Sequence, residues 1–266
     1  MYKLTLSTCW YVLRAKFDVE TYMKWIDNML TNVNNYYLVI YSDDQSVEYI
    51  KKYVNDNIKI VIKPIEEFYN YIYKDKWIEN HKKNHELRDK VGWEVNMLWS
   101  EKVHFVNETV NMKYFDTEYY GWCDIGYFRD SSKKEELKYW PVDEQMSKFS
   151  SDKIYYACVN NNDKYVSEIA TMINNKNVNG LPEKQLPPNM IMIAGGFFIA
   201  HKSMVGWWAR KYDDKLKLYF SNNYIVKDDQ MIIADCIYSM PVEHFVVCKE
   251  NKPKYNNWFM FQRLLL

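Results

Sequence analysis

Asp124 is the residue of this 266-residue chain whose type and position most favour chemistry. It follows the uncharged, aromatic run 119–123 and precedes Ile125 and Gly126, a pattern typical of a short buried strand that ends in a turn. A carboxylate at the end of such a strand lies where open α/β sheets bind their ligands. Its hard oxygens suit Mg²⁺ or Mn²⁺, with substrate phosphates as further ligands. The pattern is equally consistent with an Asp that only caps a turn.

The apolar segment 191–201 contains two consecutive glycines, Gly195 and Gly196. We interpret the segment as a strand with a kink. A kink of this kind indicates either a close approach of the backbone to a ligand or a bulge that binds nothing.

Asp228, Asp229 and Gln230 stand directly before the apolar segment 231–233, where the pattern predicts the start of a helix. A carboxylate there can act as a base or nucleophile at an electrophilic carbon. It can equally cap the helix, because an Asp at a helix start accepts backbone N–H bonds and interacts favourably with the helix dipole.

The elements that must position these groups are those of an α/β sheet. The hydrophobic pattern predicts strands at 2–7, 36–41 and 58–62, with helices at 17–30 and 47–54 between them. This alternation is the signature of a doubly wound sheet.

Thr8, Trp10 and Asp43 follow the first two of these strands. In a doubly wound sheet, such strand ends lie near the point where a nucleoside binds. We therefore expect uracil or guanine to stack near Trp10, and Asp43 to contact the base or the ribose. The alternative is that Trp10 is simply a core side chain.

The rest of the chain continues the same pattern. Segment 68–111 is mostly helical, 154–159 reads as a strand, and 203–219 as an amphipathic helix. The charged stretch 74–88 is a solvated helix face or, alternatively, a flap over the cleft. Because no repeat or linker interrupts the pattern, we expect one domain over residues 1–266, an α/β fold with a mostly parallel sheet flanked by helices.

Composition excludes several function classes. Lys and Arg balance Asp and Glu at 35 each, so no global basic field exists to attract nucleic acid or an anionic membrane. The 5 cysteines form no CxxC pair or zinc spacing, which fits a reducing compartment. No apolar run approaches the length of a membrane span, and we expect a cytoplasmic protein.

Taken in chain order, the motifs WCDIG, AGGFF and DDQ resemble the GT-A glycosyltransferases, whose fold binds nucleotide sugars. The runs LWSEK at 98–102 and WCDIGYFR at 122–129 are more closely similar to the HtrL/YibB family, itself regarded as GT-A-like. The resemblance covers about residues 36–233. It implies a glycosyltransferase that takes a UDP- or GDP-sugar donor and a glycan or protein acceptor.

The resemblance also implies roles for the candidate residues. Asp124 matches the aspartate that holds the metal and the diphosphate. Gly195 and Gly196 match a segment that lines the sugar pocket, and Asp229 with Gln230 matches an acid-Gln pair that contacts the sugar.

General chemistry supports these assignments. Departure of the nucleotide builds charge on the diphosphate, which needs a cation or basic side chains aimed at it. Lys102 and Arg129 are the basic candidates. The transition state at carbon is oxocarbenium-like, so Asp228 or Asp229 near the anomeric centre favours reaction, and we prefer Asp229.

One departure concerns the metal. Many GT-A enzymes carry a DxD motif, whereas Trp122 stands at its first acidic position here. Asp124 alone makes a weak site, so His244, His201 or a second acid would have to complete it. The expected cofactor is Mn²⁺ or Mg²⁺, with Asp124 and His244 as its ligands.

Two other function classes stay open at this point. One is a non-catalytic nucleotide- or carbohydrate-binding protein on the same fold. The other is a metal-dependent nucleotidyltransferase or phosphoesterase, which would need several clustered acids beside Asp124.

Overall fold

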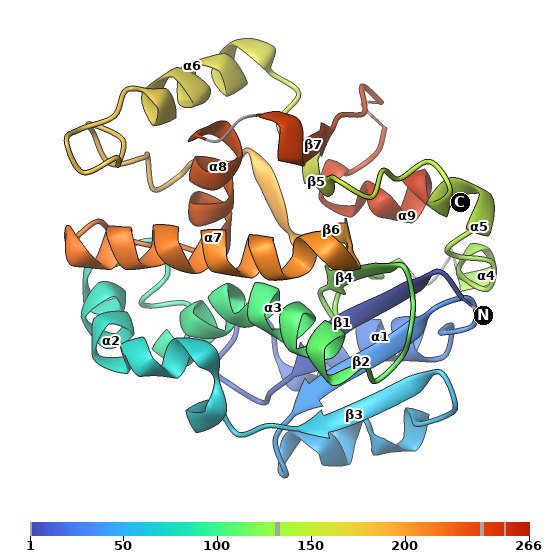
Figure 1. Ribbon diagram of the computed structural model, residues 1–266. Coiled ribbons are helices and arrows are strands. Elements are labelled where there is room, and N and C mark those ends of the chain that lie inside the picture. The colour runs from blue at the N-terminus through green and yellow to red at the C-terminus, as the bar shows by residue number, and fades with distance from the viewer. Residues whose placement is uncertain (1, 131–133, 240–241, 253) are drawn as a thin grey trace.

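A computed structural model describes residues 2–130, 134–239, 242–252 and 254–266. They form a seven-stranded sheet with the strand order β3-β2-β1-β4-β6-β5-β7 (Figure 1). The strands are β1 (Leu4–Trp10), β2 (Tyr37–Ser42), β3 (Ile58–Ile62), β4 (Tyr119–Cys123), β5 (Ile154–Cys158), β6 (Ile193–His201) and β7 (Phe245–Cys248).

The sheet is mostly parallel, as predicted. Strands β1, β2, β3 and β4 run parallel to one another, and β5 is parallel to β7. Among the strands described, β6 alone runs antiparallel to both of its neighbours, β4 and β5. The amino end of β6 therefore lies at the same edge of the sheet as the carboxyl ends of β1 and β4.

Helices cover both faces of the sheet (Figure 1). One face packs against α2 (Lys74–Lys83), α3 (Trp93–Met112), α6 (Asp163–Asn174), α7 (Lys202–Ser221) and α8 (Asp229–Ser239). The other packs against α1 (Val19–Leu30) and the C-terminal segment with α9 (Phe261–Leu264). The short helices α4 (Lys134–Leu137) and α5 (Asp143–Met146) lie between β4 and β5 in the chain.

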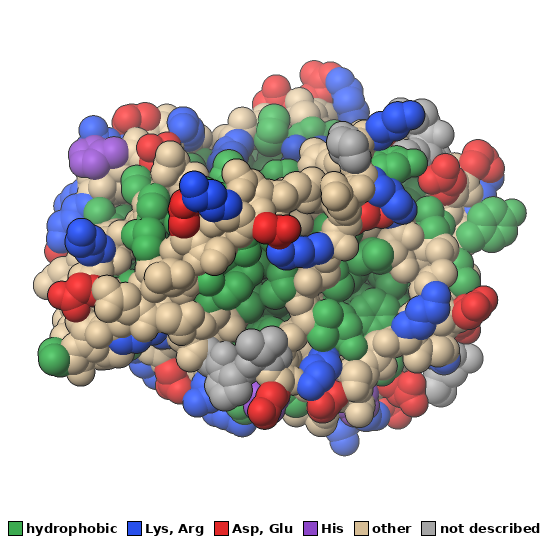
Figure 2. Space-filling model, turned by 90° about the horizontal axis from the view of Figure 1, so that it is seen from above, with side chains coloured by type: hydrophobic (Ala, Val, Ile, Leu, Met, Phe, Trp, Pro, Cys, Tyr) green, Lys and Arg blue, Asp and Glu red, His purple; other side chains and the backbone are tan. Residues whose placement is uncertain are grey.

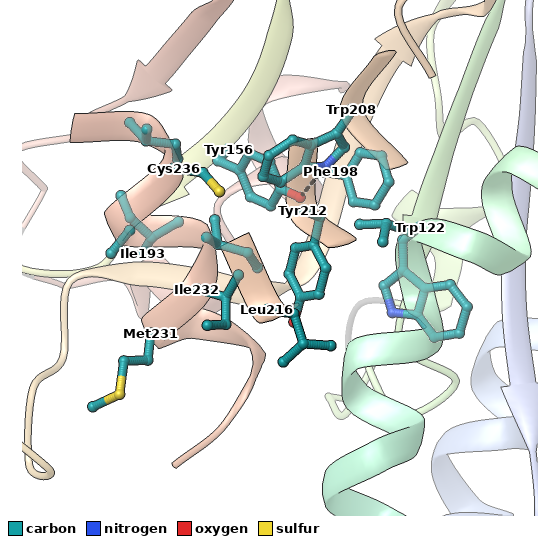
Figure 3. Packing of buried hydrophobic residues seen from close by; sticks show 14 of the residues in the cluster. Trp122, Tyr156, Ile193, Phe198, Trp208, Tyr212, Leu216, Met231, Ile232 and Cys236 are labelled. Carbon is teal, nitrogen blue, oxygen red and sulfur yellow. Dashed lines mark hydrogen bonds between the residues drawn. The ribbon is translucent and has the colours of Figure 1, made fainter. Parts of the chain in front are cut away.

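The core on the α7 and α8 side is rich in aromatic side chains. Tyr156, Phe198, Trp208 and Tyr212 lie together between the sheet and these helices, with Trp122 toward α3 (Figure 3). The Trp208 indole donates a hydrogen bond to the Tyr156 hydroxyl, which satisfies both buried polar groups.

Local signals explain helix α1. Its N-cap, Asp18, accepts the backbone N–H of Thr21, and Ile26, Met29 and Leu30 form its buried face. Placing these apolar groups against the sheet stabilises the helix more than its intrinsic propensity does.

Most predicted boundaries differ from the structure by one or two residues, and three segments differ more. The first strand continues to Trp10 because its last residues pair with β2. Segment 47–54 forms short 3₁₀ helices rather than an α-helix. Segment 68–111 begins with a short 3₁₀ helix and is divided by a turn at 84–92 into α2 and α3.

Surface charge is mixed. On the face seen in Figure 2, basic and acidic side chains lie interspersed around apolar patches, with no single-sign field. In the part of the chain that is described, no helix combines the length and the apolar character needed to cross a membrane.

Candidate functional site

Two adjoining cavities form one cleft at the carboxyl ends of β1 and β4. Both are lined by Lys102, Asp124 and Arg129, so they are continuous. The first, which we call the apolar lobe, is lined by residues 9–13, by the start of α3 and by Tyr22. The second, the acidic lobe, has a volume of about 370 Å³ and is lined by the acids of the DDQ motif.

Lys102 joins the main groups of the cleft. Its ammonium nitrogen Nζ lies 3.0 Å from Asp124 Oδ1, 3.0 Å from Asp229 Oδ2 and 2.9 Å from the carbonyl oxygen of Gly195. We call Lys102, Asp124 and Asp229 the Lys102 cluster. It brings together α3, the end of β4 and the start of α8, which are remote in sequence.

The glycine pair makes room for the two carboxylates. A Cβ atom on Gly195 would lie 2.5 Å from Asp229 Oδ2, and a Cβ on Gly196 would lie 3.0 Å from Asp124 Oδ2. Because real Cβ contacts are longer than this, larger residues would displace one carboxylate or the other. The glycines are therefore required by close approach. The pairing of β6 with β5 also shifts register between Ile193 and Phe198, so a strand irregularity occurs at the same pair.

Trp122 contributes a hydrogen bond in place of an acid. Its indole nitrogen donates to Asp124 Oδ1 over 2.7 Å. The backbone N–H of Asp124 donates to the carbonyl of Gly196, which fixes Asp124 at the end of the ladder between β4 and β6. Asp124 is thus oriented by its neighbours, while about two-fifths of its side chain, 42%, stays exposed to the cleft.

Burial and charge set the protonation of the cluster. Burial acts to lower the pKa of Lys102, but Asp124 and Asp229 outweigh it and raise that pKa above its ordinary value. Burial raises the pKa of Asp229 to about 6, an effect that Lys102 only partly offsets and that Asp228 and Asp124 reinforce. A carboxylate with a pKa near neutrality is suited to proton transfer.

Asp228 and Gln230 line the acidic lobe beside Asp229. Asp228 Oδ2 lies 3.1 Å from the Lys227 ammonium, and Oδ1 is buried with no hydrogen-bond partner among the described residues. Across the same residues, no backbone N–H of α8 donates to an Asp228 or Asp229 carboxylate. The helix-cap interpretation of this pair therefore has no support in the structure.

Buried asparagines hold the segment that leads into Asp228. Asn80 both donates to and accepts from the backbone of Val226, Asn96 donates to the Val226 carbonyl, and Asn84 donates to the Lys227 carbonyl. Sequence reasoning missed these residues, because asparagine is abundant throughout the chain and nothing in the spacing distinguishes these three.

Two cationic side chains border the acidic lobe. Arg129 lies over the ring of Trp25, 4.3 Å from its centroid, and its Nε donates to the Gly126 carbonyl. Lys16, which the sequence did not single out, lies 4.9 Å from the ring centroid of Trp99. Burial lowers the pKa of Lys16, partly offset by Asp228 and Asp229.

The three residues predicted to bind a base have different positions. Trp10 borders the apolar lobe, but its side chain is only 4% exposed and packs in the core against Tyr22, with a buried indole N–H that has no partner in the described part of the chain. The core alternative therefore describes Trp10 better than a stacking role does. Thr8 is wholly buried within β1, and Asp43 accepts the backbone N–H of Ser46. Thr8 has no exposed surface to offer a ligand, so its assignment to this cleft is wrong. Asp43 lines neither cavity, and its contact with base or ribose stays a prediction.

The prediction that His244 shares a metal site with Asp124 is also wrong. His244 directly precedes β7, whose first residue pairs with the first residue of β5, at the edge of the sheet opposite the cleft. Its ring packs on Trp207. His201 ends β6 at that same far edge, opposite Tyr119, and five residues of strand from Gly196 place it roughly 16 Å away.

The donor set does not fit a dedicated metal site. Over the residues that the structure describes, no three His, Cys, Asp or Glu side chains are placed so that they could hold a metal ion together. Asp124 Oδ1 already accepts from Trp122 and Lys102. The second nearby carboxylate, Asp229, faces the same ammonium rather than an open position.

Comparison with known proteins identifies the fold. The crystal structure of mouse xyloside xylosyltransferase 1 in its apo form is similar, with a TM-score of 0.50 and 12% sequence identity. The match covers 93% of this chain and 84% of the mouse chain, so the chain has a GT-A-like glycosyltransferase fold, as predicted. At this identity the likeness establishes the fold alone.

Sequence comparison adds the family. A search of curated proteins found no match. The family model described as "Bacterial protein of unknown function (HtrL_YibB)" matches residues 8–265, which is nearly the whole chain. The chain therefore belongs to the HtrL/YibB family.

Proposed function

We propose that this protein is a glycosyltransferase that moves a sugar from a nucleoside diphosphate sugar, a UDP- or GDP-sugar, to a glycan or protein acceptor. The observation that carries the proposal is the Lys102 cluster. Asp124 and Asp229 converge on one ammonium group at the ligand-binding edge of a GT-A-like sheet, beside two glycines that leave the cleft open.

Each lobe of the cleft suits one part of such a donor. The apolar lobe offers the side chains of Val12, Leu13 and Trp99 to a nucleoside base. The acidic lobe offers Gly196, Gln230 and Asp228, which line it, to sugar hydroxyl groups. Arg129 lines both lobes and lies between them, where the diphosphate would bind.

The chemistry follows from these positions. The bond between the anomeric carbon and the diphosphate oxygen breaks, and its electron pair leaves with the nucleotide. The acceptor oxygen bonds to the anomeric carbon and loses its proton. Asp229 stabilises the oxocarbenium-like transition state with its negative charge and, in an inverting reaction, accepts that proton.

Donor binding is the first measurement. The melting temperature of the protein should rise with one class of nucleotide sugar in a panel of UDP- and GDP-sugars, because a ligand of the native state stabilises it by mass action. No shift with any donor at concentrations up to about 1 mM would contradict the proposed donor class.

Substitution of Asp229 separates an enzyme from a binding protein. Asp229→Asn should lower nucleotide release by about 10²–10³-fold while donor affinity changes by less than about twofold, because the lost charge acts mainly in the transition state. The matched control is Asp214→Asn, which alters an exposed acid on α7 and should leave turnover unchanged.

A non-catalytic nucleotide- or carbohydrate-binding protein is the second candidate, favoured by the loss of the first acid of DxD to Trp122. Wild-type protein that binds a donor but releases no nucleotide with any acceptor would establish that alternative. Full turnover in Asp229→Asn would instead remove Asp229 from the mechanism.

A further inference from the structure

Lys102 has the contacts that a bound cation would have. An ammonium group carries three N–H donors, and the three oxygen atoms around Nζ, from Asp124, Asp229 and Gly195, lie at 2.9–3.0 Å. Two carboxylates and one carbonyl are also the kind of oxygen ligands that Mg²⁺ and Mn²⁺ take. The nitrogen therefore stands at the centre of a set of ligands suited to a hard divalent cation.

The position of Lys102 is fixed rather than incidental. Its side chain is only 7% exposed, and it reaches the cleft from α3, the helix that packs across the sheet. Without a cation, the carboxylates of Asp124 and Asp229 would repel each other in a partly buried cleft. A flexible surface lysine could leave such a position, whereas a buried ammonium held by three oxygens cannot leave without unpairing two acids.

We propose that the Lys102 ammonium occupies the place of a metal ion between Asp124 and Asp229, so that this cleft binds a nucleoside diphosphate without a divalent cation. The part that concerns the nucleotide rests on the proposed function. The part that concerns the cation does not, because it follows from the contacts of Lys102 alone.

This arrangement leaves the counter-charge for the diphosphate to other residues. Lys102 Nζ is already surrounded by three protein oxygens, through one hydrogen bond to Gly195 and two ion pairs, so it faces the protein rather than a phosphate oxygen. Arg129 and Lys16, which line the acidic lobe, are the cations on its open side. Lys16 has no ion-pair or hydrogen-bond partner among the described residues, which leaves its three donors to a ligand.

The test is a titration of the protein without nucleotide with Mn²⁺, followed by electron paramagnetic resonance. Wild-type protein should bind no stoichiometric Mn²⁺. Lys102→Ala should gain about one bound Mn²⁺, because removing the ammonium leaves two carboxylates and a carbonyl around an empty space. Lys102→Met should gain none, since its uncharged chain still fills that space. Lys215→Met is the control, a buried lysine paired with Asp235 outside the cleft.

A parallel measurement follows UDP and GDP binding by calorimetry. The dissociation constant of the nucleotide that binds should differ by less than about twofold between EDTA and excess Mn²⁺ in wild-type protein. The Lys102→Ala variant should bind the nucleotide more weakly than wild-type protein in EDTA. Addition of Mn²⁺ should then lower the dissociation constant of the variant by at least about tenfold, a rescue that is not expected if Lys102 has only a structural role.

Stoichiometric Mn²⁺ binding by wild-type protein that disappears in Asp124→Asn would overturn the proposal. So would the absence of Mn²⁺ binding from folded Lys102→Ala. If that variant does not fold, the wild-type titration decides the question. If neither nucleotide binds under any condition, the proposed function fails, while the Mn²⁺ titrations still decide the role of Lys102.

Discussion

Helix α8 carries two buried aspartates, Asp229 and Asp235, whose surroundings are opposite in charge. Asp235 is wholly buried and accepts from Lys176, Lys215, Tyr219 and the Ser239 hydroxyl. Two cations and two hydroxyl groups thus surround one carboxylate.

Asp229 lies six positions earlier, at the start of the helix, and shares a single cation with Asp124. Asp228 adds a third carboxylate nearby, paired only through one of its two oxygens. Around Asp229, carboxylates therefore outnumber the ammonium groups that pair with them. Around Asp235, two ammonium groups pair with a single carboxylate.

This difference in ion-pair partners indicates that Asp235 stabilises the fold, whereas Asp229 is available for chemistry. A carboxylate whose lone pairs are all taken by protein donors has nothing left for a ligand. A cluster with excess negative charge and a partly exposed carboxylate, Asp124, at the wall of a cleft keeps that capacity. Residue type and burial are the same in both places, so the balance of partners is what distinguishes them.

The largest expected effect is on stability, at Asp235. Asp235→Ala should lower the free energy of unfolding by about 3–5 kcal/mol, because it leaves two buried ammonium groups without their anion. Urea unfolding of the variant, compared with Asp229→Asn, is the measurement. A larger loss of unfolding free energy in Asp229→Asn than in Asp235→Ala would contradict the assignment of Asp235 to the fold and of Asp229 to the cleft.

An intermediate effect is expected at Gly195. Gly195→Ala should cost about 1–3 kcal/mol in unfolding free energy and should also lower turnover, because the new Cβ displaces the Asp229 carboxylate. The control is Gly206→Ala in α7, where the nearest atoms to a new Cβ lie at 3.5 Å and helix propensity favours alanine. Equal stability and activity in both variants would show that the close approach at Gly195 carries no consequence.

The most gradual expected effect, spread over about two pH units, is the pH dependence that Asp229 confers. The pKa of Asp229 rises from 3.8, its ordinary value, to about 6 in the folded protein. The folded protein therefore binds this proton more tightly than the unfolded chain does. The free energy of unfolding should therefore fall as pH rises from about 4 to 6, by at most about 1.4 kcal/mol per pH unit, and level off above that range.

Turnover should change in the opposite direction, falling as pH drops below about 6, because the reaction needs ionised Asp229. Asp229→Asn should remove the contribution of this group to the pH dependence of unfolding, measured by urea titration at several pH values. An unchanged stability profile in Asp229→Asn would assign the titration to another group.

The sequence by itself determined the α/β class, most strands and the motifs at Asp124, Gly195-Gly196 and Asp229. Strand 58–62 was predicted to the residue, because a near-continuous apolar run closed by Pro64 has few other conformations. The glycine pair was recognisable because glycine inside an apolar strand signals a close approach. These are local signals, and local sequence carries them.

Tertiary structure decided which of the candidates meet. His244 was a plausible ligand by type, but the direction of β7 places it at the far edge of the sheet. Lys102 was expected to face the diphosphate, yet it pairs with two carboxylates from β4 and α8. The physical reason is that strand direction and helix packing set the position of a side chain, and both depend on contacts between remote segments. Periodicity in the sequence indicates only which face of its own helix or strand a side chain occupies.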